Sequence, residues 1–303
     1  AVDPSKWRLR ALAAPFRRSA GAFMPRQDQV MNDLLTFREN STPIGGEGVF
    51  YIGTSGYSYD DWVGPYYPSG LPKKEWLSFY AGEFNASELN FTYYRLPNVW
   101  MMERIAQKTG EGFQFTVKAY KGMTHEREDN SEAFTQFVTA LTPMLEVNKL
   151  GCILLQFPHS FRPTPENFDY LERCRERLGD LPAVVEFRRA DWLTPQTFAF
   201  LREQNLGFCC VDEPRLKGLI PPVAEVTSAI AYVRFHGRNA KKWWRHEHAW
   251  ERYDYTYSEE ELREWVPKLR QLAQGAEKTF ILANNHWQGQ AVETARQLHV
   301  LLE

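Results

Sequence analysis

The stretch CILLQFPHSFRPTPENFDYLERCRERLGDLPAVVEF, residues 152–187, contains the unit from which the fold follows. An apolar run at 152–157 precedes a segment at 165–178 that has the 3.6-residue period of an amphipathic helix. A second apolar run follows at 183–187, and Thr164-Pro165-Glu166 is typical of a helix N-terminus. A strand, a helix and a strand in this order predict two parallel strands joined by a crossover helix.

The same unit repeats on both sides of this stretch. Eight strand-like runs in all, most of them separated by helical segments, predict a single (β/α)₈ TIM barrel of the α/β class. An open doubly wound sheet is the competing fold, but GTSGYSYDD after the first run lacks the Gly-x-Gly-x-x-Gly phosphate turn. The other predicted strands cover 49–55, 87–94, 113–119, 207–212, 231–236 and 279–285. The other predicted helices cover 98–108, 131–145, 195–204, 258–274 and 291–302.

The composition of the chain indicates which partners and which cellular compartment to expect. The formal net charge of −2 means that any affinity for anions must come from a local patch. No apolar run approaches the roughly 20 residues that span a bilayer, so we expect no membrane contact. We expect four reduced, buried thiols and a cytoplasmic protein, because no Cys-x-x-Cys pair occurs. The cysteines are Cys152, Cys174, Cys209 and Cys210.

The N-terminal residues differ in kind from the rest. Residues 1–26 contain six basic side chains against one acid, Asp3, as in an organelle transit peptide. The simpler interpretation, which we prefer, is an added or upstream extension ahead of Met24. We therefore expect residues 1–44 to be a basic extension, vector-derived or disordered, and residues 45–303 to form the barrel domain.

Polar side chains gather where the predicted strands end, which is where TIM-barrel enzymes carry their sites. Strand alternation puts these side chains on the inner face of the barrel. Six buried charges cost several kcal/mol per ion before pairing, so a ring of them favours a site over a structural network. The inward-facing candidates are Glu88, Asn90, Lys118, Gln156, Glu186, Arg188, Asp212, Arg234, His236, and Asn284 or Asn285.

Seven ordered motifs resemble those of the YecE-like family, a domain of unknown function. They are IGTSGYSYDDWVGPYYP, SELNFTYYRLP, VKAYKGMTH, LLQFPHSF, VEFRRADW, RFHGR and NNHWQGQAVETA, between about Tyr51 and Leu301. The resemblance implies a TIM barrel and a shared pocket, but it supplies no reaction. Phe91, Ser87 and Thr294 depart from the usual motif residues. The resemblance places in the pocket most of the candidates above, together with Thr92, His125, Gly237 and, at the last strand, Asn285.

Two functions fit these residues. The first is an acid–base hydrolase, lyase or isomerase that acts on a phosphorylated or otherwise anionic, sugar-like substrate. Glu186 is then the acid or base, Glu88 and His236 are its partners, and the other candidates bind substrate. Lys118, Arg188 and Arg234 suit the anionic group. A glycosidase fits less well, because His236 stands where a second carboxylate is usual in barrel glycosidases.

The second function is nucleic-acid binding or processing. The loop GRNAKKWWRHEHAWERY, residues 237–253, interleaves basic and aromatic residues as single-strand binders do. A non-catalytic carbohydrate or anion binder is a third alternative. We expect no cofactor, although a divalent metal on Glu88, Glu186, Asp212 and His236 is an alternative that the neighbouring cations disfavour. The oligomeric state does not follow from the sequence.

Overall fold

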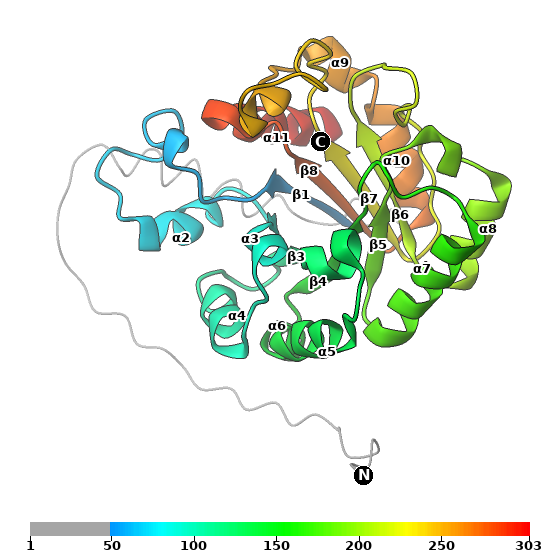
Figure 1. Cartoon of the computed structure of the whole chain (residues 1–303). Helices are drawn as coiled ribbons and strands as arrows, with labels where there is room; N and C mark the ends of the chain where they lie inside the picture. Colours follow the sequence, from blue (N-terminus) through cyan, green and yellow to red (C-terminus); the bar gives the residue numbers. More distant parts are fainter. Residues whose placement is uncertain (1–48) are drawn as a thin grey trace. The chain divides into compact units, whose positions relative to one another are not determined.

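Eight parallel strands close into a barrel in the computed structural model, which describes residues 49–303 (Figure 1). Consecutive strands pair with each other, and β1 closes the ring by pairing with β8 from Val49↔Lys278 to Thr54↔Ala283. The predicted (β/α)₈ barrel is therefore confirmed. The strands are β1 Val49–Ser55, β2 Ala86–Leu89, β3 Gln114–Lys118, β4 Leu150–Gln156, β5 Ala183–Glu186, β6 Gly207–Asp212, β7 Ile230–Phe235 and β8 Lys278–Ala283.

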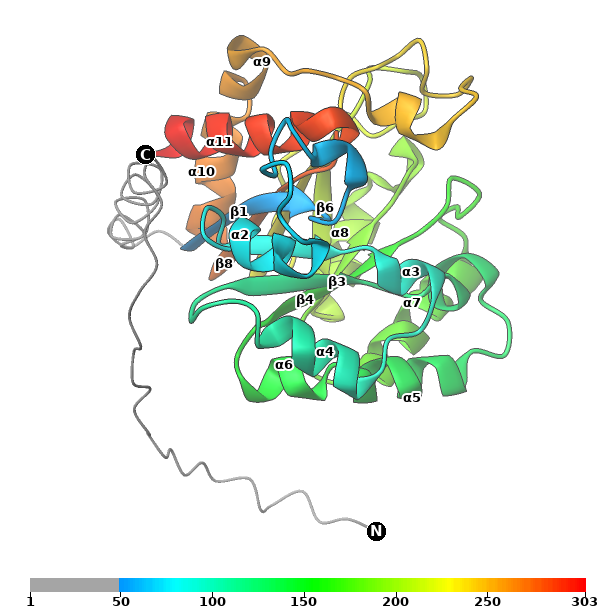
Figure 2. The same cartoon turned by 90° about the vertical axis from the view of Figure 1, so that its left-hand side faces the viewer.

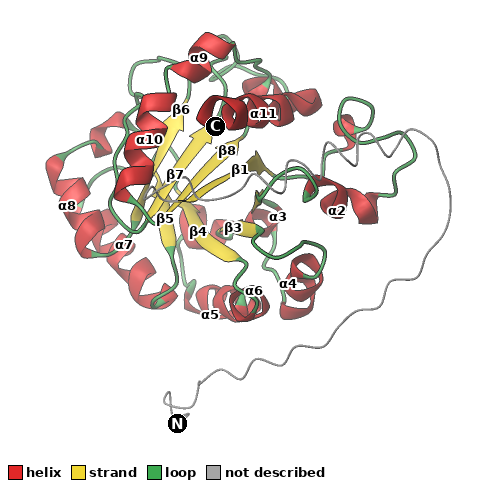
Figure 3. Cartoon of the chain, turned by 180° about the vertical axis from the view of Figure 1, so that it is seen from behind, coloured by secondary structure: helices red, strands yellow, loops and turns green. Residues whose placement is uncertain are grey.

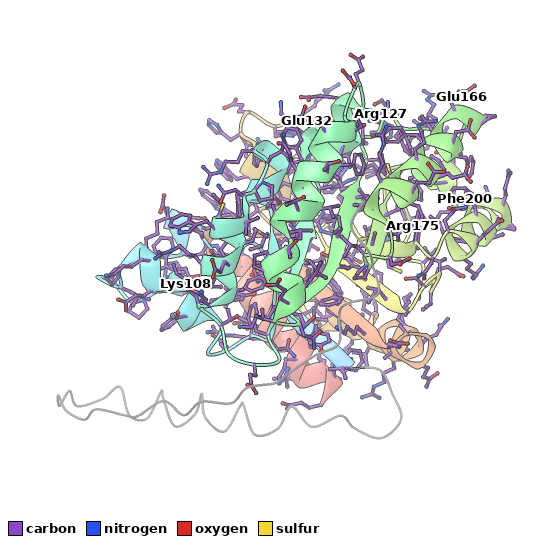
Figure 4. All side chains as sticks on the ribbon, turned by 90° about the horizontal axis from the view of Figure 1, so that it is seen from below. Lys108, Arg127, Glu132, Glu166, Arg175 and Phe200 are labelled. Atoms are coloured by element: carbon purple, nitrogen blue, oxygen red, sulfur yellow. The ribbon has the colours of Figure 1, made fainter. Side chains whose placement is uncertain are left out.

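The helices surround these strands, with α4, α5 and α6 on one side of the barrel and α9 and α11 on the opposite side (Figures 2 and 3). Exposed acids such as Glu132 and Glu166 stand on the outer helices α5 and α7 (Figure 4). The helices are α2 Trp76–Tyr80, α3 Phe91–Tyr94, α4 Val99–Ala106, α5 Ser131–Ala140, α6 Thr142–Glu146, α7 Pro165–Leu178, α8 Pro195–Glu203, α9 Glu259–Arg263, α10 Val266–Gly275 and α11 Gln290–Leu302.

Local sequence explains where several helices begin. Asn98 and Thr194 accept hydrogen bonds from the backbone N–H groups of Met101 and Thr197, and Ser258 forms a capping box with Glu261. Two predicted helices are each divided in two. Segment 131–145 splits into α5 and α6, and segment 258–274 splits into α9 and α10. In each case a proline stands in the first turn of the second helix. The N–H group that proline lacks would make no intrahelical hydrogen bond at this position, so the proline is tolerated there.

The predicted strand 87–94 is wrong in its second half. Strand β2 ends at Leu89, Asn90 has helical dihedral angles, and α3 follows at once. The Thr92 hydroxyl lies 3.0 Å from the carbonyl oxygen of Leu89 and 2.6 Å from that of Lys118, which ties the turn to the end of β3. The aromatic run after Asn90 resembles a strand in sequence, but tertiary contacts impose a helical turn.

Other expectations have mixed outcomes. All four cysteines are free and buried, as predicted. The 17-residue connection from β6 to β7 contains no helix, although helices join most of the other strands of the described chain. None of the helices between residues 49 and 303 combines the length and the apolar character needed to cross a lipid bilayer. The predictions for residues 1–44 lie outside the described residues.

Candidate active site

A cavity of about 610 Å³ opens at the carboxyl ends of the barrel strands. Its wall includes many aromatic side chains, among them Tyr59, Tyr93, Trp250 and Tyr253. Charged and amide side chains from four or more strand ends share this cavity, which is the arrangement that the sequence predicted. The predicted residues that line it are Glu88, Asn90, Lys118, Arg188, Arg234 and Asn284.

Arg234 joins the two carboxylates of this site. Its Nη2 donates to Glu88 Oε1 at 2.6 Å and its Nη1 donates to Glu186 Oε2 at 2.7 Å. All three side chains are almost completely buried, with Arg234 2% exposed. The remaining Arg234 donor, Nε, has no hydrogen-bond partner. Arg234 therefore fixes the positions of both acids while one polar group beside the cavity stays unsatisfied.

Glu186 is surrounded by positive and donor groups. Arg188 Nη2 lies 2.9 Å from its Oε1, and His236 Nε2 donates to the same oxygen at 3.1 Å. Burial alone would raise the pKa of Glu186, but Arg188, Arg234 and His236 outweigh burial and hold the pKa well below its usual value. Glu186 is therefore a permanent carboxylate, which does not fit the general acid or base that the sequence predicted.

His236 is held neutral. Burial and the nearby Arg188 lower its pKa to about 3, so the imidazole carries no charge at ordinary pH. Because Nε2 donates to Glu186, Nδ1 is the acceptor, and Asn284 Nδ2 donates to it at 2.9 Å. This chain of contacts fixes one tautomer and leaves His236 as a positioning residue between Glu186 and Asn284.

Lys118 differs from every other charged member of the site. Among the described residues its Nζ has no hydrogen-bond acceptor and no ion pair, and its nearest aromatic contact is the Tyr93 ring, 4.6 Å from Nζ to the ring centroid. Burial and the neighbouring Arg234 lower the pKa of Lys118 to about 7. The amine thus faces the cavity and exchanges its proton near neutral pH.

A second, smaller cavity of about 210 Å³ adjoins the first. The two share Arg188 and Tyr253 in their walls. Burial and then Lys118 lower the pKa of His125 to about 4, and Gln156 Nε2 donates to the carbonyl of Phe157 at 2.7 Å. The predicted residues His125 and Gln156 therefore belong to this side cavity, with Trp243 and Trp244 in its wall.

Two predicted residues point away from both cavities. Asp212 accepts hydrogen bonds from Arg238, Tyr257 and Trp265 in the helix layer. Asn285 Nδ2 donates to the Tyr255 carbonyl and to Thr294 of α11. Placing Asp212 and Asn285 in the pocket was wrong, because adjacent residues of a strand face opposite sides and the assignment was shifted by one residue.

Two of the family-implied residues, Thr92 and Gly237, stabilise the backbone rather than line the cavity. Thr92 closes the β2–α3 turn, as described above. Gly237 has φ +89, and its N–H donates to the Tyr257 hydroxyl at 2.9 Å. A Cβ at this position would lie 2.7 Å from Tyr255, so glycine is needed for both reasons.

Sequence reasoning missed several members of the site. The Tyr232 hydroxyl donates to Glu88 Oε2 at 2.7 Å, and its position two residues before Arg234 on the same strand face could have identified it. Glu213 follows Asp212 directly; its Oε1 accepts from the Ile220 N–H and its Oε2 lies 3.8 Å from Arg188 Nη1. Burial raises the pKa of Glu213 to about 7.

The aromatic wall comes from the connections that follow the strands, namely the loop after β1, the short α3 and the 3₁₀ helix Ala249–Tyr253, all too short to give a periodic signal in the sequence. Tyr59 stacks on His286 with ring centroids 4.7 Å apart, and Trp250 stacks on Trp287 at 3.7 Å. Two polar atoms beside the cavity, Asn90 Oδ1 and His286 Nδ1, are buried without a hydrogen-bond partner. Such atoms are rare in native structures and commonly mark a place where a ligand or water completes the contacts.

The loop at 238–253 uses much of its charge internally. Arg238 contacts Asp212, Lys242 pairs with Glu251, and Arg252 donates to the carbonyl of Trp243. Trp244 is the exposed aromatic of the loop, 53% exposed. Between residues 49 and 303 no three His, Cys, Asp or Glu side chains are grouped so that they could hold a metal ion. Three of the proposed metal ligands, Glu88, Glu186 and His236, are bonded to protein partners.

Comparisons with known proteins agree with the motifs. The family model described as "Protein of unknown function DUF72" matches residues 51–303. The chain is 35% identical over 271 residues to the UPF0759 protein YunF of Bacillus subtilis, covering 84% of this chain and 95% of that protein. The crystal structure of a DUF72 family protein from Thermotoga maritima is 39% identical, with a TM-score of 0.77, and covers 84% of this chain and 98% of that one. One from Enterococcus faecalis is 28% identical, with a TM-score of 0.74 and coverages of 84% and 95%.

Proposed function

The chain belongs to the DUF72 family of proteins of unknown function, and we propose that it is an enzyme that binds a small phosphorylated or otherwise anionic polar substrate and moves a proton with Lys118. The observation that carries this proposal is the unpartnered Lys118 amine in the larger cavity, with a pKa of about 7. A general acid or base works best when its pKa lies near the operating pH.

The charge of the cavity supports an anionic substrate. Lys118, Arg188 and Arg234 face the carboxylates of Glu88 and Glu186, and Glu213, the third acid near Arg188, has a pKa raised to about 7, while Asp212 belongs to the helix layer. Arg188 is 13% exposed and lines both cavities, so its guanidinium is in reach of an anionic group from either side. A planar guanidinium matches the geometry of phosphate and carboxylate oxygens.

The two carboxylates receive positioning roles in this proposal. Glu186 accepts from Arg234 and His236 and pairs with Arg188, and Glu88 accepts from Arg234 and Tyr232, so every carboxylate oxygen of the two acids is engaged by a protein donor. Both acids would keep the guanidinium groups aimed at the cavity before the substrate arrives. Such preorganised charge is the largest contribution to catalysis in many enzymes.

Isothermal titration calorimetry with phenyl phosphate, which joins a phosphate to an aromatic ring, tests the anion site. We expect binding at pH 7 and about a tenfold to hundredfold weaker Kd for Arg188→Gln, the value of a charge-assisted hydrogen bond. Arg189→Gln is the matched control, because Arg189 pairs with the surface residue Asp191. Equal affinities of the two variants, or no binding by the parent, would contradict the proposal.

A pH series with phenyl sulfate, whose charge is constant, tests the proton role of Lys118. We expect binding to weaken as pH rises through about 7, because Lys118 loses its positive charge, and Lys118→Met to lessen this dependence. Glu213, with a pKa of about 7, adds a smaller change in the same direction. An unchanged pH profile in Lys118→Met would remove Lys118 from the proposal. The charged groups that act on Lys118 are Glu88, Glu186, Arg188 and Arg234, and the neighbouring His125 stays neutral over this pH range because its pKa is about 4.

Nucleic-acid binding receives less support. Three of the five basic residues of the loop 238–253 are engaged with protein groups, which leaves Lys241 and Arg245 beside the exposed Trp244. Fluorescence anisotropy with a single-stranded oligonucleotide over a salt series separates the two functions. Tight binding that falls steeply with salt, together with no binding of phenyl phosphate, would favour the nucleic-acid function.

A further inference from the structure

Two lysines of the barrel, the half-buried Lys118 and the buried Lys149, differ in the hydrogen bonds that their amines make. Lys149 Nζ donates to the carbonyl oxygens of Ala106 and Thr109, each at 2.6 Å, and to the Thr109 hydroxyl at 3.0 Å. Lys118 Nζ has neither a hydrogen-bond acceptor nor an ion pair among the described residues. Lys149 therefore has the contacts of a structural lysine, whereas the amine of Lys118 is available to the cavity.

The surroundings of Lys118 favour a neutral, nucleophilic amine. The Tyr93 ring lies on one side, and no carboxylate oxygen of residues 49–303 lies within ion-pair distance of Nζ. The guanidinium groups of Arg188 and Arg234 share the cavity wall and oppose a further positive charge. A lysine becomes a nucleophile by this combination of desolvation and neighbouring cations.

We propose that Lys118 forms a covalent imine with the carbonyl carbon of an anionic aldehyde or ketone, whose anionic group is bound by Arg188. This inference rests on the proposed function and names its substrate class. The cavity of about 610 Å³ leaves room for a small substrate beside the amine, with its anionic group near the shared wall of the two cavities.

The step balances without an oxidant or a reductant. The lone pair of Nζ forms the N–C bond, the C=O π electrons move to oxygen, and the nitrogen proton is transferred to that oxygen, giving a carbinolamine. A second proton, taken from solvent, lets the C–O bond break with loss of water and leaves a protonated imine. Its positive charge stabilises a carbanion on the adjacent carbon, so the reaction class is proton abstraction or carbon–carbon cleavage next to the carbonyl. Hydrolysis restores the amine.

Reductive trapping tests this inference with pyridoxal 5′-phosphate as an anionic aldehyde. The full chain is treated with one equivalent of probe at pH 7, reduced with sodium borohydride and mapped by peptide mass spectrometry. We expect Lys118 to be labelled at least tenfold more than any other lysine, phenyl phosphate to suppress that label, and pyridoxal, which lacks the phosphate, to label Lys118 at least tenfold less.

Two arginine variants provide the controls. Lys118→Arg keeps a positive charge without a nucleophilic amine and should lose the label. Lys121→Arg, three residues away at a lysine paired with Glu126, should keep it. Label spread over surface lysines, while phenyl phosphate still binds, would overturn the imine and leave the proposed function standing. Absence of both label and phenyl phosphate binding would overturn both.

Discussion

Two carboxylate–arginine clusters lie at the carboxyl ends of the barrel strands, one inside the barrel and one outside it. The inner cluster contains Glu88, Glu186 and Arg234, and the outer one contains Asp212 and Arg238. The three carboxylates are completely buried, and all lie within or at the end of a strand. In the sequence they are indistinguishable, yet their surroundings give them different roles.

The outer cluster is saturated. Asp212 accepts two hydrogen bonds from Arg238 at 2.8 Å and one each from Tyr257 and Trp265 at 2.7 Å. These donors come from the loop after β7 and from the α9–α10 region, so Asp212 fastens that region to β6. With four donor atoms on one carboxylate and no place in the wall of either cavity described above, Asp212 has the properties of a structural residue.

The inner cluster is incomplete by comparison. Arg234 Nε and Asn90 Oδ1 have no partners, and Lys118 Nζ has no acceptor. Arg188 and Lys118 border a cavity that a ligand can enter. The comparison teaches that buried charge at a strand end does not by itself identify a site. Unsatisfied polar atoms that border a cavity do.

The largest effect that we expect is on stability, when either cluster loses its carboxylate. Asp212→Asn and Glu186→Gln should each lower the free energy of unfolding by about 3–5 kcal/mol, because each removes the buried charge partner of an arginine. Arg238 then keeps only the more exposed Glu261 and Glu264, and Arg188 keeps only Glu213, 3.8 Å away. Only Glu186→Gln should change phenyl phosphate binding, tightening it about tenfold, since glutamine keeps an acceptor oxygen and removes the negative charge that neutralises Arg188 and Arg234 beside the cavity. Urea denaturation and calorimetry measure the two quantities. An Asp212→Asn variant with altered affinity would place Asp212 in the site.

The repeated strand–helix pattern predicted the barrel, and the alternation within each strand predicted most of the inner cluster. Successive side chains of a barrel strand point alternately into the barrel and toward the helices, even where both faces are buried. Glu88, Glu186 and Arg234 follow directly from this alternation. The alternation failed where strands end. Asp212 and Asn285 each have a polar neighbour, Glu213 and Asn284, and composition cannot tell which of the pair faces inward. Tyr59 was missed because the loop after β1 has no period, and Trp250 was noted only as part of the basic, aromatic segment 237–253 and not as part of the cavity wall.

The pKa values that define the site follow from three-dimensional distances. Lys118 ends β3 at the carboxyl side of the barrel and Lys149 directly precedes β4 at the opposite side, but only the structure shows that the Lys149 amine has hydrogen-bond acceptors and the Lys118 amine has none. In the same way, the sequence suggested Glu186 as acid or base because it does not show that Arg188, Arg234 and His236 all contact this carboxylate. The sequence therefore identified most of the charged side chains of the site, whereas their roles follow only from the three-dimensional contacts.

Removal of the Lys118 amine should change the free energy of unfolding by a smaller amount and in the opposite direction. Lys118→Met should raise the free energy of unfolding by about 2–4 kcal/mol at pH 7 and below, because the pKa falls from 10.5 in the unfolded chain to about 7 in the fold. Between those values the unfolded chain binds more protons, so the parent gains stability as pH rises and the advantage of the variant fades by about pH 10.

Lys149→Met is the matched control for that measurement. It removes three hydrogen bonds and leaves the carbonyl oxygens of Ala106 and Thr109 without their donor, so it should lower the free energy of unfolding by about 1–3 kcal/mol. Urea unfolding at pH 6, 8 and 10 follows both variants. If Lys118→Met also destabilises the protein at pH 6, the Lys118 amine makes contacts like those of Lys149, and the contrast between the two lysines fails.

The smallest expected effect concerns Glu213, which lies beside both clusters. Burial raises its pKa from 4.5 to about 7, with Arg188 opposing burial and the nearby Glu186 and Asp212 adding to it. The folded protein therefore binds more protons than the unfolded chain between these pH values, and the stability that Glu213 contributes below pH 4.5 is lost as pH rises to 7. Above pH 7 the fold holds a buried carboxylate whose Oε2 accepts no hydrogen bond and lies 3.8 Å from Arg188.

Glu213→Gln keeps the acceptor for the Ile220 N–H and removes the charge. It should match the parent at pH 5 and exceed it by about 1–2 kcal/mol at pH 8, less than the full shift because the new amide N–H group faces Arg188. Equal stabilities at both pH values would mean that Arg188 already compensates the Glu213 charge, and that the guanidinium is bound to protein rather than available to a substrate.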